Sequence, residues 1–498
     1  MNIGRKALIF FTLLAGAVAV SAESSSRLHW LGRQQLAAET NAARFMDIWK
    51  LPESARLEAQ LLNTLASATN AVAARLRPLL DDLVQAESYA EVRHATNQPG
   101  QLAFAIRISE ARARWWETNL PSALDGFEVK RAGGWTLVGR ATGANALLAE
   151  WQEHIAKTGS PAAKGATNFW LEADVDLPQV ARVFGWKLEL PAGWPRIFMT
   201  VTGDGENVLT RGTLDFAKPL DLKLEPWSIP TNLIREPLIG FAAVRGLGSA
   251  LAESPFWKGA QIGAAPEQMF FWAQASMPFE VYFAGLLPDA TNRVERLSER
   301  LLAGGNDWAA TNRMGSFERT PAGHGVVWKN VPFMAPFMQS VAIRQEEYVF
   351  GGLIEMANTR SNATLPAALL TQIISTPDLV LYDWEMTGPR MESWLHIGQL
   401  FRVIFHEAQL PANSAGLDWL RAVSSKLGNT VTVVRQTAPG HLAFTRKSTS
   451  GFTALELHLL ADWAESPAFP EGLHTFKAAP AAVFGAKRPL PSGAIPKK

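Results

Sequence analysis

The longest regular pattern of apolar positions in the chain runs from residue 57 to residue 83. Its apolar side chains recur at spacings of three and four residues, which is the period of one helix face. The stripe consists of Leu57, Leu61, Leu65, Ala68, Val72, Leu76, Leu79 and Leu83. Pro52 separates this helix from a shorter one over residues 40–50, and Pro78 should kink or split it. We therefore expect an N-terminal helical segment over residues 23–98, packed on the body of the protein.

Beyond residue 98 the pattern changes to short strands that alternate with helices, and it repeats weakly. Residues 101–108 and the helix after them resemble residues 280–287 and their following helix, which aligns Phe104 with Phe283. Residues 135–139 resemble 348–352, residues 169–178 resemble 378–388, and each copy ends in a β-meander. The second copy is longer, and we place its insertion at residues 331–338.

This repeat predicts an α+β fold with two similar lobes, each a mainly antiparallel sheet with packed helices. The expected domains are a first lobe over residues 99–228, a second over 229–477, and a disordered basic tail, rich in Pro and Ala, over 478–498.

The N-terminus has the composition of a secretory signal peptide. Arg5 and Lys6 precede an apolar run from Ala7 to Val20, and small residues follow up to Ala22. The run is shorter than the ~20 residues that span a bilayer. We expect cleavage before Glu23 and a periplasmic or secreted protein with no membrane span, with a retained N-terminal anchor as the alternative.

Composition narrows the function classes. The absence of cysteine excludes disulfides, thiolate metal sites and cysteine nucleophiles. The 47 basic and 46 acidic residues nearly balance, so the concentrated basic surface that nucleic acids require is not expected. The 18 Trp residues mainly follow apolar patterns and should supply core area.

One predicted helix, over residues 390–409, carries a candidate acid/base cluster. Glu392, His396 and Glu407 fall on one face of such a helix. A polar outer stripe explains the same spacing, and it is the interpretation we favour. Leu410 stands where a zinc-protease motif beginning at His406 would need its second histidine.

The repeat also aligns two pairs of carboxylates. Asp174 and Asp176 fall on Asp383 and Glu385, and residues two apart on a strand share a face, so each pair could hold a hard cation. Asp176 also precedes a predicted helix through Phe184, which suits an N-cap. We favour helix capping and expect neither a metal nor a cofactor.

No motif names a reaction, since the glycine patterns of nucleotide sites and the common serine-hydrolase motifs are missing. We expect an exported, non-catalytic envelope protein that binds an apolar ligand or a protein partner between its lobes. The expected lining comes from the insertion, namely Phe333, Met334, Phe337 and Met338. The alternatives are an insertion that fills a core gap, a metal-independent hydrolase with an unrecognised site, and an assembly factor that acts through the N-terminal helices.

Overall fold

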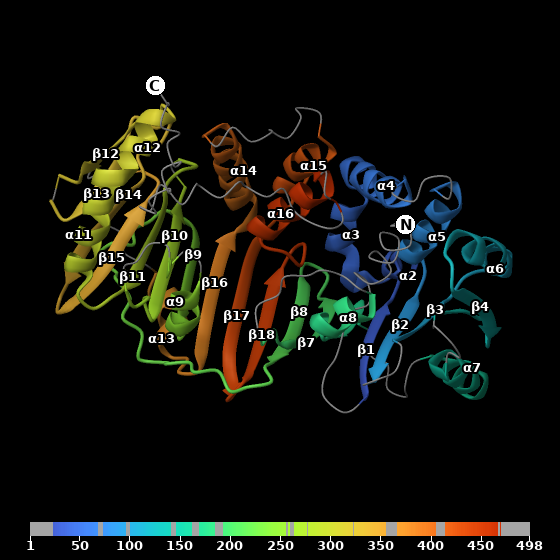
Figure 1. The fold of residues 1–498 in the computed structure, drawn as a ribbon. Coiled ribbons are helices and arrows are strands. Elements are labelled where there is room, and N and C mark those ends of the chain that lie inside the picture. The colour runs from blue at the N-terminus through green and yellow to red at the C-terminus, as the bar shows by residue number, and fades with distance from the viewer. Residues whose placement is uncertain are drawn as a thin grey trace, which may run out of the picture. The chain divides into compact units, whose positions relative to one another are not determined.

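The computed structural model divides into two compact units (Figure 1). Unit 1 comprises Met1–Leu220 and Pro411–His474, and unit 2 comprises Asp221–Leu410 and Thr475–Lys498. Each combines an antiparallel sheet with helices, so the expected α+β class is confirmed. The structure describes residues 23–67, 73–95, 100–140, 146–161, 169–184, 193–254, 257–258, 263–275, 277–321, 323–354, 366–404, 414–466 and 469. The predicted signal peptide and the predicted tail lie outside these residues.

The strands of unit 1 form one antiparallel sheet in the order β4-β5-β3-β2-β1-β6-β7-β8-β18-β17. They are β1 (Glu23–Trp30), β2 (Ser88–Ala95), β3 (Gln101–Ile106), β4 (Phe127–Ala132), β5 (Trp135–Arg140), β6 (Leu171–Val175), β7 (Arg196–Gly203), β8 (Val208–Asp215), β17 (Asn429–Ala438) and β18 (His441–Ser448). The expected helical segment over residues 23–98 therefore begins and ends in strands, β1 and β2, which pair with each other. Its helices are an insertion between two neighbouring strands.

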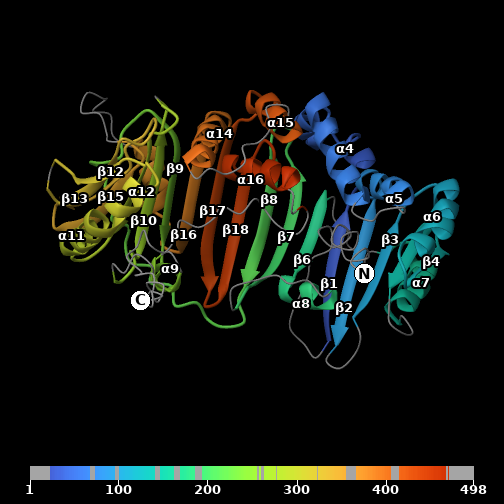
Figure 2. The same ribbon diagram turned by 45° about the horizontal axis from the view of Figure 1, so that its top comes forward.

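The helices of unit 1 cover both faces of its sheet. They are α2 (Arg33–Leu36), η1 (Thr40–Ala42), α3 (Ala43–Trp49), α4 (Pro52–Ser67), α5 (Ala73–Gln85), α6 (Glu110–Ala123), α7 (Ala146–Thr158), α8 (Leu177–Phe184), α15 (Ala415–Ser424) and α16 (Ala454–Glu465). Helices α4, α5 and α6 share an apolar core with Phe104 of β3, and α7 shares another with Ala103 and Ala105. Figure 2 shows the ribbons of these helices around strands β1 to β5. Successive strand residues point to opposite faces, so these cores lie on the two sides of the sheet.

The predicted helical stripe is buried where the structure describes it, except at Leu61, which is half-buried. Helix α4 begins at Pro52, as the sequence indicates, and Pro78 lies inside α5. Five members of the stripe are buried: Leu57, Leu65, Leu76, Leu79 and Leu83. Leu65, Leu76, Leu79 and Leu83 belong to the apolar core that also contains Phe104 of the sheet.

Residues from the C-terminal part of the chain complete unit 1. Strand β18 pairs with β8 in an antiparallel ladder that sets Leu442 opposite Leu214. The indole Nε1 of Trp419 on α15 donates a hydrogen bond of 3.0 Å to Oγ of Ser54 on α4. The meander expected to end the second lobe is thus part of unit 1.

Unit 2 has an antiparallel sheet in the order β16-β9-β10-β11-β15-β14-β13-β12. Its strands are β9 (Leu238–Arg245), β10 (Gln268–Gln274), β11 (Val281–Leu286), β12 (Ser316–Arg319), β13 (Gly325–Lys329), β14 (Phe337–Ile343), β15 (Glu346–Gly352) and β16 (Leu379–Met386). Its helices are α9 (Gly248–Glu253), α11 (Ala290–Arg300), the π-helix η3 (Leu301–Gly305), α12 (Asn306–Thr311), α13 (Ala367–Ile374) and α14 (Thr387–Ile404). Buried aromatic rings fill its core, including Trp272 stacked on Phe350 at 5.9 Å between centroids.

Within the described part of the chain, no helix combines the length and the apolar character that crossing a membrane requires.

Candidate functional site

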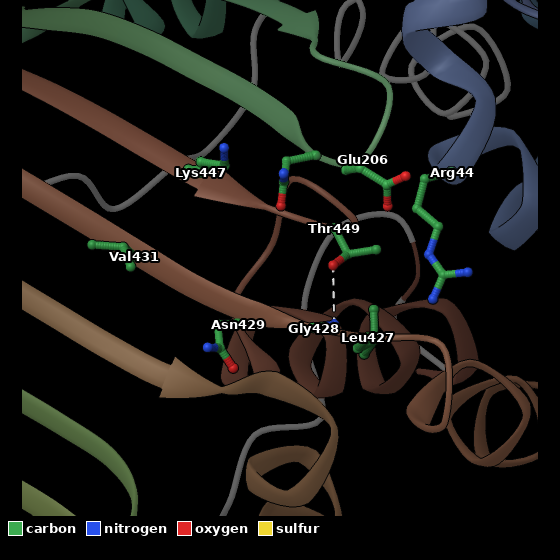
Figure 3. Close-up of a pocket in the computed structure, with 9 residues that line it drawn as sticks. Arg44, Glu206, Leu427, Gly428, Asn429, Val431, Lys447 and Thr449 are labelled. Carbon is green, nitrogen blue, oxygen red and sulfur yellow. Dashed lines mark hydrogen bonds between the residues drawn. The ribbon is translucent and has the colours of Figure 1, made fainter.

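A cavity of about 350 Å³ lies within unit 1, where α3, the turn between β7 and β8, and the adjoining ends of β17 and β18 meet (Figure 3). It is lined by Arg44, Glu206, Asn207, Leu427, Gly428, Asn429, Val431, Lys447 and Thr449. We call it the Arg44 pocket. Its walls come from three segments that are far apart in the sequence. A local sequence motif therefore could not predict the pocket.

The turn between β7 and β8 is shaped by Asp204. Its Oδ1 accepts hydrogen bonds from the backbone N–H of Glu206 at 3.1 Å and of Asn207 at 2.7 Å, which is an Asx-type turn. Gly205 has a φ of +96°, a value that favours glycine. Nζ of Lys447 lies 2.9 Å from Oδ2 of Asp204, and this hydrogen bond is the main cause that lowers the pKa of Asp204 to about 2. The ion pair holds Lys447 at the rim of the pocket.

Arg44 lies on the side of the pocket away from Lys447. Its backbone N–H donates to the carbonyl of Gly205 at 3.2 Å, and its guanidinium Nη2 donates to the carbonyl of Lys426 at 2.9 Å. In Figure 3 the side chains of Arg44 and Glu206 lie on one side of the pocket and Lys447 lies on the other. Thr449 connects the segment after β18 to the segment before β17, because its Oγ1 accepts a hydrogen bond of 2.9 Å from the backbone N–H of Gly428.

The pocket is polar, whereas the sequence suggested an apolar groove. Its lining contains two cationic side chains, one carboxylate, two amides and a hydroxyl, against the apolar Leu427 and Val431. Among the described residues that line it there is no histidine. Such a set of groups suits recognition of a small polar molecule by hydrogen bonds and charge.

The four residues expected to line a ligand groove lie in unit 2 and do not line this pocket. Met334 and Phe337 are buried, and Met338 is half-buried against other apolar side chains. Phe333 alone is displayed, with 80% of its surface exposed. These contacts agree with the alternative of an insertion that fills a core gap, for every member except Phe333.

The carboxylates of the first aligned pair have structural partners. Asp174 accepts two hydrogen bonds from Arg196, at 2.8 Å from Nε and 2.7 Å from Nη2. Oδ1 of Asp176 accepts from the backbone N–H of Gln179 at 3.1 Å, at the start of α8. The capping role expected for Asp176 is therefore present.

The second pair lies beside a half-buried arginine, Arg390. Glu385 is buried, and Asp383 is half-buried, on β16. Burial lowers the pKa of Arg390, and the negative charges of Glu385 and Asp383 oppose that shift. Among the residues described, no group of three or more His, Asp or Glu side chains could hold a metal ion.

The strand registers do not bring the two carboxylate pairs to matching positions. Phe104 lies in one row with Ala90, Leu28 and Ala173, each opposite the next across the sheet. Phe283 lies in the corresponding row of unit 2, formed with Phe271, Ala242 and Asp383. With Phe104 matched to Phe283, Asp383 aligns with Ala173 and not with Asp174. A shift of one residue reverses the face of a strand, so the two pairs point to opposite sides of their sheets.

The candidate acid/base residues on α14 are not assembled into a site within the described residues. His396 and Glu392 are both exposed, and Nδ1 of His396 donates to the backbone carbonyl of Glu392 at 2.7 Å. Glu407 lies outside the described residues.

The structure also brings together a partly buried cluster that the sequence did not indicate. The ring of His29 stacks on Tyr89 at 4.0 Å between centroids, and Nε2 of His29 lies 3.2 Å from Oε1 of Glu87. The hydroxyl of Tyr89 donates to the same oxygen at 3.3 Å, and Gln35 donates to Oε2 at 3.1 Å. Only the β1–β2 register, which sets His29 opposite Tyr89, creates this contact.

Both oxygens of the Glu87 carboxylate accept hydrogen bonds within this cluster. Burial works against the charged form of Glu87, but the hydrogen bonds from His29 and Gln35 and the charges of His29 and Arg107 outweigh it and lower the pKa of Glu87. Burial raises the pKa of Tyr89. Both carboxylate oxygens of Glu87 are engaged, so the cluster acts as a structural connection between β1, β2 and α2.

Comparisons of the chain with protein-family models, with curated proteins and with solved structures gave no match.

Proposed function

We propose that the chain is an exported, non-catalytic binding protein of the cell envelope that holds a small polar ligand in the Arg44 pocket. The observation that carries the proposal is the convergence of Arg44, Glu206 and Lys447, from three separate segments, on one cavity of about 350 Å³. Cavities of ~300–1,000 Å³ are typical of small-molecule sites. The sequence suggested an apolar ligand, but the polar lining of this pocket favours a polar one.

The ligand that fits this lining carries a carboxylate. A guanidinium has five N–H donors, and the carbonyl of Lys426 engages only one nitrogen of Arg44. Hydrogen bonds between a guanidinium and a carboxylate are about twice as strong as neutral ones. Glu206 on the same side favours a ligand that also has a hydrogen-bond donor, and the amides of Asn207 and Asn429 can donate or accept.

We also infer that the chain contains the tandem repeat indicated by its sequence. The strand order β4-β5-β3-β2-β1-β6 in unit 1 supports this, because unit 2 has β14-β15-β11-β10-β9-β16. The cross-strand pair Phe104–Val138 corresponds to Phe283–Gly351, as the sequence alignment requires. The Arg44 pocket lies outside these six-strand elements. Its binding role would thus belong to segments added around the repeated element.

A ligand-dependent shift of the melting temperature tests the pocket. Citrate and L-glutamate serve as carboxylate probes, and glucose serves as a neutral one. We expect a carboxylate probe to raise the melting temperature of the wild type and to lose this effect in Arg44→Gln. Arg56→Gln is the matched control, since Arg56 lies on α4 of the same unit and pairs with Asp418 away from the pocket. Equal shifts in Arg44→Gln and Arg56→Gln would refute the proposal, because the effect would then be a general one of the solute.

A further inference from the structure

The turn that joins β13 to β14 holds an aromatic residue in a backbone conformation that favours glycine. Val331 and Met334 form an isolated antiparallel bridge, and the N–H of Met334 donates to the carbonyl of Val331 at 3.4 Å. Pro332 occupies the second position of the turn, and Phe333, with a φ of +62°, occupies the third. This is the pattern of a type II turn, in which glycine or asparagine is usual at the third position. A bulky side chain there is unfavourable for the fold unless its display has another use.

The side chain of Phe333 points away from the body of the protein while its neighbours anchor the turn. Val331 and Met334 are each 6% exposed and belong to one apolar cluster with Met314 and Leu400. Phe333 is 80% exposed. Among the large apolar side chains that the structure describes, the next most exposed is Ile374, at 61%. The turn is thus anchored by its buried residues, and it exposes the ring of Phe333 to solvent.

The loop that carries Arg313, between α12 and β12, lies against the same turn. Met314 of this loop packs with Val331 and Met334, and its carbonyl accepts a hydrogen bond of 2.5 Å from the indole of Trp328. Arg313, the preceding residue, is exposed and forms no ion pair with any described residue. Lys329, at the end of β13, is also exposed, although Glu318 pairs with it at 2.9 Å. An aromatic tip and an uncompensated cation therefore share one end of unit 2.

We propose that this end of unit 2 docks on an anionic lipid surface, with the ring of Phe333 inserted among the headgroups and Arg313 beside their phosphates. Phenylalanine is among the apolar residues that surface-bound segments bury at the boundary between headgroups and acyl chains. An arginine near an anionic membrane adds electrostatic attraction and pairs well with phosphate oxygens. One ring and one cation give weak, reversible contact, so the surface would position the protein without embedding it. The proposal concerns a surface of unit 2 and is independent of the Arg44 pocket.

Sedimentation with vesicles tests the lipid contact. The protein is prepared without residues 1–22, which precede β1 and whose apolar run would bind lipid by itself. The vesicles are phosphatidylcholine alone or phosphatidylcholine with a minority of phosphatidylglycerol. We expect the wild type to partition onto the mixed vesicles, and Phe333→Ser to lower the partition coefficient about tenfold or more, the effect of withdrawing one aromatic side chain from an apolar environment. Arg313→Gln should weaken binding to the mixed vesicles only.

Ile374→Ser is the matched control, because it removes another exposed apolar side chain of unit 2. It should bind vesicles as the wild type does. The proposal is overturned if the wild type fails to bind the mixed vesicles, if Phe333→Ser binds as well as the wild type, or if Ile374→Ser loses as much binding as Phe333→Ser. Failure of the wild type to bind would leave Phe333 as a contact for a protein partner instead.

A stability measurement separates display from a role in folding. Phe333→Gly should keep or raise the melting temperature, since glycine adopts a φ of +62° without strain. A melting temperature that falls in both Phe333→Gly and Phe333→Ser would assign Phe333 to the fold and would contradict the proposal.

Discussion

The guanidinium carbon of Arg245 lies 4.5 Å from the centroid of the Trp227 ring. Arg245 is on β9 and is only 2% exposed. Its Nε donates to the carbonyl of Leu379 at 2.8 Å, and its Nη2 donates to that of Pro377 at 2.6 Å. Burial lowers the pKa of Arg245. This buried cation is satisfied by carbonyl dipoles and an aromatic face, and it joins the segment before β9 to the start of β16.

Replacing Arg245 should therefore destabilise unit 2 strongly. Arg245→Met removes the donors from the carbonyls of the buried Leu379 and of Pro377, at an expected cost of about 3 kcal/mol or more in the free energy of unfolding. Arg245→Lys should recover only part of this, because an ammonium cannot reach carbonyls in several directions. Urea unfolding measures both. Arg319→Met is the control, since the exposed pair of Arg319 with Glu295 contributes ~0–1 kcal/mol. Equal losses in the two methionine variants would contradict the role of Arg245.

The cap at Asp176 should respond differently to alanine and asparagine. Asp176→Ala removes the acceptor for the Gln179 N–H and should cost about 0.5–2 kcal/mol. Burial raises the pKa of Asp176, so the stability linked to its titration is fully present at low pH and is lost as the pH rises through the folded pKa.

Asp176→Asn keeps the acceptor without a charge and should be as stable as the wild type at pH 7, or more so. Any advantage should shrink as the pH falls and the wild-type carboxyl becomes protonated. Thermal unfolding of the three proteins against pH measures this. Asp176→Asn behaving like Asp176→Ala at neutral pH would argue against the cap.

The cluster around Glu87 should make unit 1 sensitive to acid. The pKa of Glu87 is lowered in the folded state, so its stabilising contribution is present above the unfolded pKa near 4.5 and is lost as the pH falls through the folded pKa. Glu87→Gln should be less stable than the wild type at pH 7, and the gap should narrow on acidification. Urea unfolding at several pH values measures the gap. A gap that does not change with pH would show that charge is not the basis of the cluster.

The contact between Ser54 and Trp419 should account for part of the stability of unit 1. Oγ of Ser54 accepts from Trp419 and donates to the carbonyl of Ile48 at 2.8 Å, and the site is buried. Ser54→Ala leaves the indole N–H of Trp419 without an acceptor and should lower the free energy of unfolding by about 1–3 kcal/mol. Trp419→Phe combined with Ser54→Ala should cost less than the sum of the two single changes. Ser122→Ala, at an exposed serine of α6, is the control and should change the free energy of unfolding by less than ~0.5 kcal/mol. If the losses of stability in Ser54→Ala and Trp419→Phe were additive in the double variant, that result would contradict the contact.

Local patterns predicted the local features well. The period of three and four found the helices that became α4 and α5, and the position of Asp176 before an apolar helix predicted its cap. Both depend on residues within a few positions of one another, where helix geometry alone decides which side chains meet.

Features that depend on strand pairing were not accessible in the same way. β1 has the sequence ESSSRLHW, whose polar first half lacks the alternation that identifies a strand, and it is held by partners on both sides, β2 and β6. The Arg44 pocket and the His29 cluster likewise form only when registers bring distant residues together. Phe333 was singled out as apolar, but nothing local distinguished its displayed ring from its buried neighbour Met334.

The discontinuity of unit 1 has a consequence for the order of events during synthesis. Its β8 edge pairs with β18, and α4 contacts α15, yet residues 221–410 of unit 2 are made between these partners. A ribosome or a translocation channel that releases the chain from its N-terminus would emit the first part of unit 1 long before the strands that complete it. Until then the β8 edge and the surface of α4 remain uncovered and open to wrong pairing. The described strands and helices of unit 2 all lie within residues 221–410 and can pack together first, so we expect a holding chaperone to be needed most while this segment is emerging.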